Sequence, residues 1–164
     1  MHKQVSKQTG FTIVELLIVI VVIAILAAIT IVAYNGIQNR ATAAKEISDI
    51  QSIDKAIQLY YIDNGSYPPT PGNTWVGWSQ APNFVPGITP KYIANQPQRN
   101  SSADSSATYL YESNGTDYKL LSHRPQPPNN YPVCAAASSA VPAMADTARS
   151  CWAFGTWSSA AAGW

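Results

Sequence analysis

Apolar residues dominate the chain directly after residue 10. Residues 11–33 hold 20 apolar side chains in 23 positions, and only Thr12, Glu15 and Thr30 interrupt the run. At about 1.5 Å per residue, a helix of this length reaches roughly 35 Å, enough to cross a hydrocarbon core of about 30 Å. The pattern therefore predicts a membrane-spanning helix over residues 11–33.

From Tyr34 the pattern becomes amphipathic. Apolar residues recur at steps of three or four, the helical period, at Ile37, Ala41, Ala44, Ile47, Ile50, Ile53, Ile57 and Tyr60. Most charged residues lie between them, and Asn64-Gly65 supplies a stop, with Gly65 as a left-handed cap. We expect one helix over residues 11–62, whose amphipathic part (34–63) buries its stripe under a small head; a heptad coiled coil is the rival interpretation.

The rest of the chain, residues 64–164, cannot be mainly helical. All 12 prolines fall between Pro68 and Pro142. Residues 68–106 mix aromatic side chains with Pro, Gly and Asn, which predicts an irregular layer over the helix and a sheet, with a mobile tip at Asn100–Ser106.

Strand signals follow this layer. Two aromatic-rich runs flank Asn114-Gly115, which predicts an antiparallel hairpin over residues 107–123. The aromatic residues Trp152, Phe154, Trp157 and Trp164 predict a last strand on the same sheet, or alternatively an exposed aromatic patch for subunit contact or adhesion. The fold class is α+β: a long N-terminal helical stem and a small C-terminal head with an antiparallel sheet.

Composition and charge exclude several functions. The net charge is +1 and only 12% of residues are charged, which argues against nucleic acid as a specific partner. The head offers only the scattered basic residues Lys91, Arg99, Lys119, Arg124 and Arg149. The chain carries no G-x-S-x-G, Walker, H-E-x-x-H or C-x-x-C pattern, so we expect neither an enzyme nor a cofactor.

The flanks of the apolar run indicate its orientation. Lys3 and Lys7 precede it without an acidic residue, so the positive-inside rule places the N-terminus in the cytoplasm and the head outside. The run is longer than the apolar region of a cleaved secretory signal peptide and lacks its A-x-A site. A plain single-pass anchor fits the length but explains neither Glu15 nor the Gly10-Phe11 junction.

The stretch Lys7–Ile20, KQTGFTIVELLIVI, accounts for all of these features. It closely resembles the prepilin signature shared by type IV pilins and the pseudopilins of type II secretion. The resemblance extends to about Tyr34, and at the end of the helix Gly65-Ser66-Tyr67-Pro68 resembles the Gly-x-Tyr-Pro of the same proteins.

The resemblance implies roles for three residues. Residues 1–10 are a leader that a prepilin peptidase removes between Gly10 and Phe11, and Phe11 becomes the N-methylated first residue. Glu15 is the residue needed for assembly, where it pairs with the terminal amine of a neighbouring subunit. A lone carboxylate in hydrocarbon needs such a cation, and the only competing interpretation is a polar residue at a helix contact. Val32 stands where many relatives have proline, so the helix lacks that kink.

Cys134 and Cys151 are the only cysteines, and both fall in the part expected outside the cytoplasm. An oxidising compartment favours a disulfide between them, closing the 134–151 region, as type IV pilins often have. Major pseudopilins bind calcium in the head, but the acidic residues Asp104, Glu112, Asp117 and Asp146 do not reproduce a calcium loop, so no metal site is predicted.

The expected function is a structural subunit of a type IV pilus or pilus-like filament, serving adhesion, motility or DNA uptake. Its expected partners are the prepilin peptidase, other copies of itself or other pilins through the stem, an inner-membrane assembly platform and, before assembly, membrane lipid. The alternatives are a pseudopilin of a type II secretion system and a membrane-anchored binding protein that forms no filament.

Overall fold

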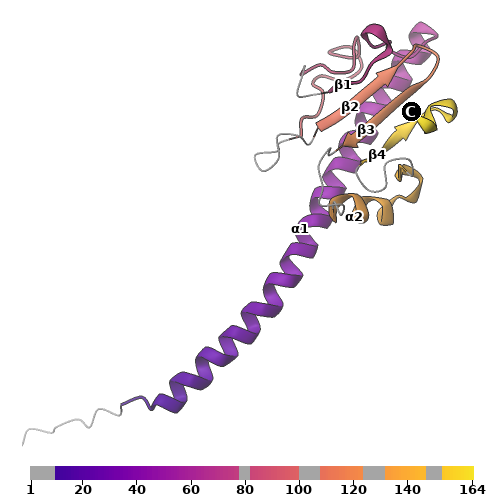
Figure 1. The fold of residues 1–164 in the computed structure, drawn as a ribbon. Helices are drawn as coiled ribbons and strands as arrows, with labels where there is room; N and C mark the ends of the chain where they lie inside the picture. Colours follow the sequence, from indigo (N-terminus) through magenta and orange to yellow (C-terminus); the bar gives the residue numbers. More distant parts are fainter. Residues whose placement is uncertain (1–9, 78–81, 100–107, 124–131, 147–152) are drawn as a thin grey trace, which may run out of the picture. The chain divides into compact units, whose positions relative to one another are not determined.

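The computed structural model describes residues 10–77, 82–99, 108–123, 132–146 and 153–164. The chain divides into two compact units, Met1–Gln38 and Asn39–Trp164. One helix, α1 (Ile13–Asn64), supplies the regular structure of the first unit and opens the second (Figure 1). The predicted single long helix is therefore confirmed, and it continues through Gly36.

The end of α1 follows the predicted stop signal. Gly65 adopts a φ of 71°, in the left-handed region where a side chain is disfavoured. Its backbone N–H donates to the Tyr61 carbonyl oxygen at 2.8 Å, so one of the free carbonyls at the helix end is satisfied.

The second unit is built on a four-stranded antiparallel sheet in the order β1-β2-β3-β4. The strands are β1 (Val76–Gly77), β2 (Thr108–Ser113), β3 (Tyr118–His123) and β4 (Ala153–Trp157). The predicted hairpin is β2–β3, in which Thr108 pairs with His123 and Ser113 with Tyr118. The predicted last strand is β4, which pairs with β3 along its length.

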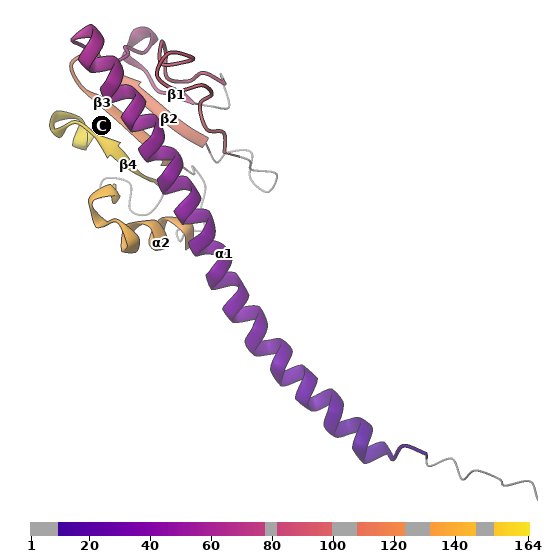
Figure 2. The same ribbon diagram turned by 180° about the vertical axis from the view of Figure 1, so that it is seen from behind.

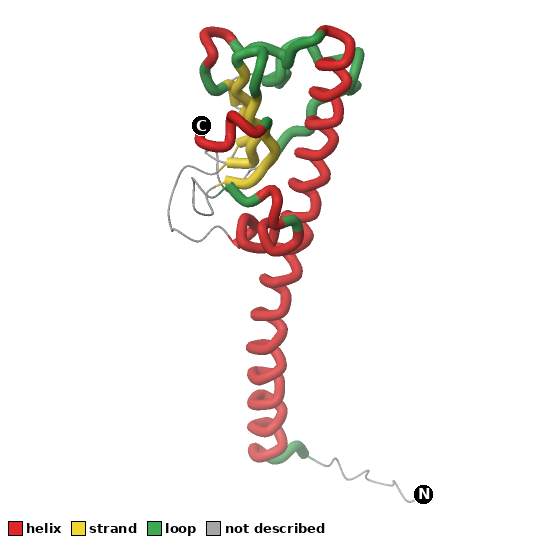
Figure 3. Tube along the Cα trace, turned by 90° about the vertical axis from the view of Figure 1, so that its right-hand side faces the viewer, coloured by secondary structure: helices red, strands yellow, loops and turns green. Residues whose placement is uncertain are grey.

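Short helices complete this unit (Figure 3). The helix α2 (Pro132–Ala140) and the 3₁₀ turn η2 (Pro142–Met144) lie between β3 and β4 in sequence. The turns η1 (Pro71–Asn73) and η4 (Ser159–Gly163) precede β1 and follow β4. The predicted mobile tip at Asn100–Ser106 lies outside the described residues.

The core lies between the second half of α1 and one face of the sheet (Figures 1 and 2). Ile50, Ile53 and Ile57 on α1 are fully buried. The segment between β1 and β2 adds Phe84 and Val85, also fully buried, which confirms the irregular layer predicted there. The apolar stripe of α1 therefore packs under a head of its own chain, as predicted, and the coiled-coil alternative is not needed.

The predicted stripe is wrong at its beginning. Ile37, Ala41 and Ala44 are exposed, whereas Ala43 and Glu46 are buried. The head begins to cover α1 near Ala43, and from there the buried positions follow the helical period through Ile57. Periodicity alone could not locate this starting point, because the covering residues come from distant parts of the chain.

Three acidic residues of α1 join it to the sheet. The Glu46 carboxylate lies 2.9 Å from the Arg99 guanidinium and accepts a hydrogen bond from the Ser122 hydroxyl. Asp49 accepts one from the Tyr109 hydroxyl at 2.6 Å, and Asp54 accepts others from Tyr118 and Thr156. We call Glu46, Asp49 and Asp54 the polar seam.

Burial between α1 and the sheet shifts the pKa of Glu46 and of three tyrosines of the head. Burial raises the pKa of the Glu46 carboxyl, and the attraction of Arg99 partly offsets this rise. Burial, reinforced by hydrogen bonds to Asp49 and Asp54 respectively, raises the pKa of Tyr109 and of Tyr118 far above the ordinary range. Burial also raises the pKa of Tyr111, whose hydroxyl donates to the Pro68 carbonyl oxygen.

We predict that the head loses stability steeply above pH 10. Tyrosines of the unfolded chain release their protons near pH 10, while Tyr109, Tyr111 and Tyr118 keep theirs in the folded head, so the folded state binds more protons. Three such groups lower the free energy of unfolding by about 4 kcal/mol per pH unit above pH 10. Urea unfolding of the full chain in detergent, followed by circular dichroism from pH 8 to 11, measures this slope. Tyr109→Phe should reduce it by about a third; an unchanged slope would contradict the linkage.

We also predict that Gly155→Ala strongly destabilises the head. A Cβ at position 155 would lie 1.9 Å from the Leu120 carbonyl oxygen on β3, so β3 and β4 would have to separate. We expect a loss of about 3 kcal/mol or more in the free energy of unfolding. Gly163→Ala is the matched control, because a Cβ there meets nothing within 4 Å and should leave stability nearly unchanged. Equal stability of the two variants would contradict the close strand approach.

Candidate processing and assembly site

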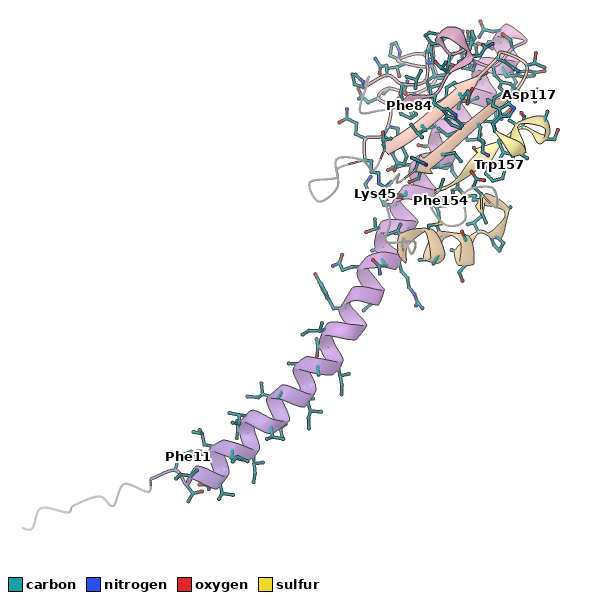
Figure 4. The ribbon with its side chains drawn as sticks, in the orientation of Figure 1. Phe11, Lys45, Phe84, Asp117, Phe154 and Trp157 are labelled. Carbon is teal, nitrogen blue, oxygen red and sulfur yellow. The ribbon has the colours of Figure 1, made fainter. Side chains whose placement is uncertain are left out.

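The predicted cleavage junction precedes α1. Gly10, Phe11 and Thr12 are not helical, and α1 begins at Ile13. Phe11 is 80% exposed, at the start of the stem in Figure 4. The Gly10–Phe11 peptide bond is therefore exposed and lies outside the helix, where a peptidase can reach it. The rest of the predicted leader, residues 1–9, lies outside the described residues.

Glu15 sits in the first turn of α1 and is bound by the residue that precedes the helix. Its Oε2 accepts hydrogen bonds from the Thr12 backbone N–H at 2.8 Å and from the Thr12 hydroxyl at 2.6 Å. The Glu15 backbone N–H in turn donates to the Thr12 hydroxyl oxygen, with an N···O distance of 3.3 Å. This arrangement is a capping box, which satisfies free donors at the helix start and favours a negative charge there.

Thr12 is the site residue that the sequence reasoning missed. The signal was present, because Thr-x-x-Glu before an apolar run is the pattern of a capping box. In the described part of the chain, no ion pair involves Glu15, and its second oxygen, Oε1, accepts no hydrogen bond. Among the described residues, only Oε2 of this carboxylate is bound.

The segment around Glu15 is apolar and uncovered. Its large side chains from Ile13 to Ile31 are exposed, and the most apolar stretch of α1 has no residue buried within the molecule. By length and composition, α1 is able to cross a membrane. The Thr30 hydroxyl donates to the Leu26 carbonyl oxygen at 2.7 Å, so this polar group already has a partner within the helix.

The predicted disulfide is only half described. Cys134 is buried on α2, and its Sγ lies 3.7 Å from the carbonyl oxygen of Ala153. Cys151 lies outside the described residues, two positions before Ala153 in sequence. The fold thus brings Cys134 beside the start of β4, close in sequence to its expected partner.

The basic residues expected on the head are largely engaged in ion pairs. Arg99 pairs with Glu46 and Lys119 with Asp146, and all four side chains are buried. Lys91 pairs with Asp63 at the surface, while Arg124 and Arg149 lie outside the described residues. In the described ranges, no group of three His, Cys, Asp or Glu side chains is arranged to hold a metal ion.

Known proteins resemble this chain along the stem and into the head. Residues 5–31 match the prokaryotic N-terminal methylation motif. The type II secretion system core protein G of Pectobacterium carotovorum subsp. carotovorum is 31% identical over 116 residues, which cover 70% of this chain and 67% of that protein. The protein of the same name from Vibrio cholerae is 37% identical over 68 residues, 42% of this chain and 47% of that relative.

A type IV major pilin protein of Neisseria gonorrhoeae is also similar, with 33% identity over 95 residues, 58% of this chain and 54% of that protein. The chain thus spans about two thirds of the Pectobacterium relative and about half of the other two. No solved structure matches the chain at a significant level. The methylation motif, the long stem with its antiparallel head, and these relatives agree: the chain belongs to the type IV pilin and type II secretion pseudopilin family of filament subunits.

Proposed function

We propose that this chain is cut between Gly10 and Phe11 by a prepilin peptidase, methylated at Phe11 and polymerised through α1 into a pilus-like filament. The observation that carries the proposal is the placement of one carboxylate, Glu15, in the first turn of α1, within its otherwise apolar first half. It lies directly after an exposed, non-helical Gly10-Phe11 junction. Anchoring a protein in a membrane requires neither a carboxylate in the apolar segment nor an exposed junction before it.

Cleavage supplies a positive charge that can pair with the Glu15 carboxylate. The new amine of Phe11 is a cation, and methylation leaves its charge intact. Thr12 holds Oε2 of Glu15. In the proposed assembly, Oε1 binds the amine of a second copy. In a low-dielectric environment such a pair is far stronger than in water, and an unpaired carboxylate is costly. Assembly therefore proceeds where two apolar stems come together with these charges matched.

The stem is a membrane span before assembly. Lys3 and Lys7 keep the N-terminus in the cytoplasm, so the head lies on the opposite side of the membrane. Packing against other stems then replaces contact with lipid when the filament forms. The partners in this step are the peptidase, other pilin-like subunits and an inner-membrane assembly platform.

Between the two kinds of filament, the relatives favour the pseudopilus of a type II secretion system. Proteins named type II secretion system core protein G match this chain in several bacteria, in one case over 116 residues, which is 70% of the chain. A type IV pilus is the second candidate, supported by the similarity to the Neisseria pilin and by the two cysteines of the head. Deleting the gene separates them: loss of exoprotein secretion with surface pili retained supports the first, and loss of pili supports the second.

We predict that Glu15→Gln leaves cleavage intact but reduces incorporation into filaments at least about tenfold, because the pair with the Phe11 amine loses its charge. Quantitative blotting of filaments sheared from the surface or cross-linked in the cell envelope, compared with the uncross-linked membrane fraction, measures the effect. Thr30→Val is the matched control in the same apolar segment, and we expect it to assemble normally because the Thr30 hydroxyl bonds only within the helix. Filaments of Glu15→Gln at the level of the unaltered chain would refute the pairing.

We further propose that Cys134 and Cys151 form a disulfide. The position of the Cys134 sulfur beside Ala153, at the start of β4, supports the pairing. Closing 16 intervening residues stabilises the head by about 3 kcal/mol in the chain-entropy model.

We therefore predict that Cys134→Ala lowers the free energy of unfolding by about 3 kcal/mol. We also predict that the cysteines of the unaltered chain, denatured without a reducing agent, resist alkylation. Ser139→Ala, at an exposed position further along α2, is the control and should change stability little. Alkylation of both cysteines without prior reduction would show the bond to be absent.

A further inference from the structure

Lys119 is the most unusual charged residue of the head. It is the second residue of the hairpin strand β3 and is fully buried. Its neighbour Tyr118 faces α1, where its hydroxyl binds Asp54. Because successive side chains of a strand point to opposite faces, Lys119 projects from the face of the sheet turned away from α1. A fully buried ammonium is costly unless oxygen atoms replace its water.

The Lys119 ammonium is surrounded by such oxygen atoms. Its Nζ donates to the main-chain oxygens of Ala162 and Trp164, both at 3.0 Å. The Asp146 carboxylate, 1% exposed, lies 3.2 Å away. The Trp157 ring, labelled on β4 in Figure 4, has its centre 5.1 Å from Nζ. A lysine ammonium has three donors, and oxygen atoms of Ala162, Trp164 and Asp146 are within reach of this one.

These oxygen atoms come from segments that are distant in sequence. Ala162 lies in the last turn of η4, Trp164 follows η4, and Asp146 lies two residues beyond η2. The last carbonyls of a helix have no partner within it and carry a partial negative charge. Main-chain oxygens and a carboxylate are also ligands that hard metal cations accept.

We propose that the Lys119 ammonium acts as an internal cation that fastens residues 158–164 and Asp146 to the sheet, in a cage that otherwise suits a small free cation. An ion pair alone would need only Asp146, whereas this side chain also binds two main-chain oxygens of the segment after β4. The segment is thereby held without a divalent ion. The proposal concerns the folding of the head and does not depend on filament formation.

Amide hydrogen exchange of the full chain in detergent tests the proposal. The backbone N–H groups of Ala161 and Trp164 close the turns of η4. Lys119→Met keeps the apolar part of the side chain and removes its charge. We expect it to make these amides exchange at least about tenfold faster, while the β2–β3 amides keep most of their protection. Lys91→Met is the control, because it removes a lysine whose pair with Asp63 is exposed. Unchanged exchange in Lys119→Met would overturn the proposal.

Two further arms keep the test decisive if Lys119→Met does not fold. Lys119→Ala removes the atoms of a propylammonium ion, so adding this ion in excess should restore protection of residues 158–164, or refold an unfolded variant. Failure of propylammonium to restore either overturns the proposal. In the unaltered chain, exchange in this segment should be the same in calcium and in chelator. Slower exchange with calcium would mean that a metal, not Lys119, holds the segment.

Discussion

The apolar half of α1 is the constraint on which the rest of the molecule depends. Its side chains from Ile13 to Ile31 are not covered by other parts of the chain. Exposure of so large an apolar surface to water is energetically unfavourable. Lipid or other stems must supply that cover, which is why the same surface suits a membrane span and a filament core. Within it, Glu15 is the one group that hydrocarbon does not tolerate alone, and the capping box with Thr12 satisfies only one of its oxygens. We propose that this carboxylate finds its second partner in the amine of a neighbouring subunit.

The second half of α1 meets a different requirement, because it must hold the head in water. Apolar contacts through Ile50, Ile53 and Ile57 supply most of the burial. The polar seam fixes the position of the head on this half of α1. Its three acids bind Arg99, Tyr109 and Tyr118, which come from separate parts of the head. Such bonds are costly to break one at a time, since each leaves a buried charge or hydroxyl without a partner. On the opposite face of the sheet, Lys119 serves the segment that follows β4 in a comparable way.

Local patterns predicted the elements of this fold well, and long-range contacts were beyond them. The apolar run, the Asn64-Gly65 stop and the Asn114-Gly115 hairpin are encoded in neighbouring residues, and α1, β2 and β3 follow them closely. The burial of Glu46 and Lys119 has no local signature, because their partners Arg99 and Asp146 are distant in sequence. Of the candidate site, Gly10, Phe11 and Glu15 were predicted from their motif. The contribution of Thr12 could be predicted only by recognising residues 12–15, Thr-x-x-Glu, as a capping box.

The most direct test of the account is the mass of the chain in its assembled form. Intact-mass spectrometry of sheared surface filaments, or of filaments cross-linked in the cell envelope, identifies the first residue of the chain. The account predicts a chain that begins at Phe11 and carries one methyl group on its amine. A chain in these filaments that retains Met1 to Gly10, or that begins at Phe11 without the methyl group, would contradict it.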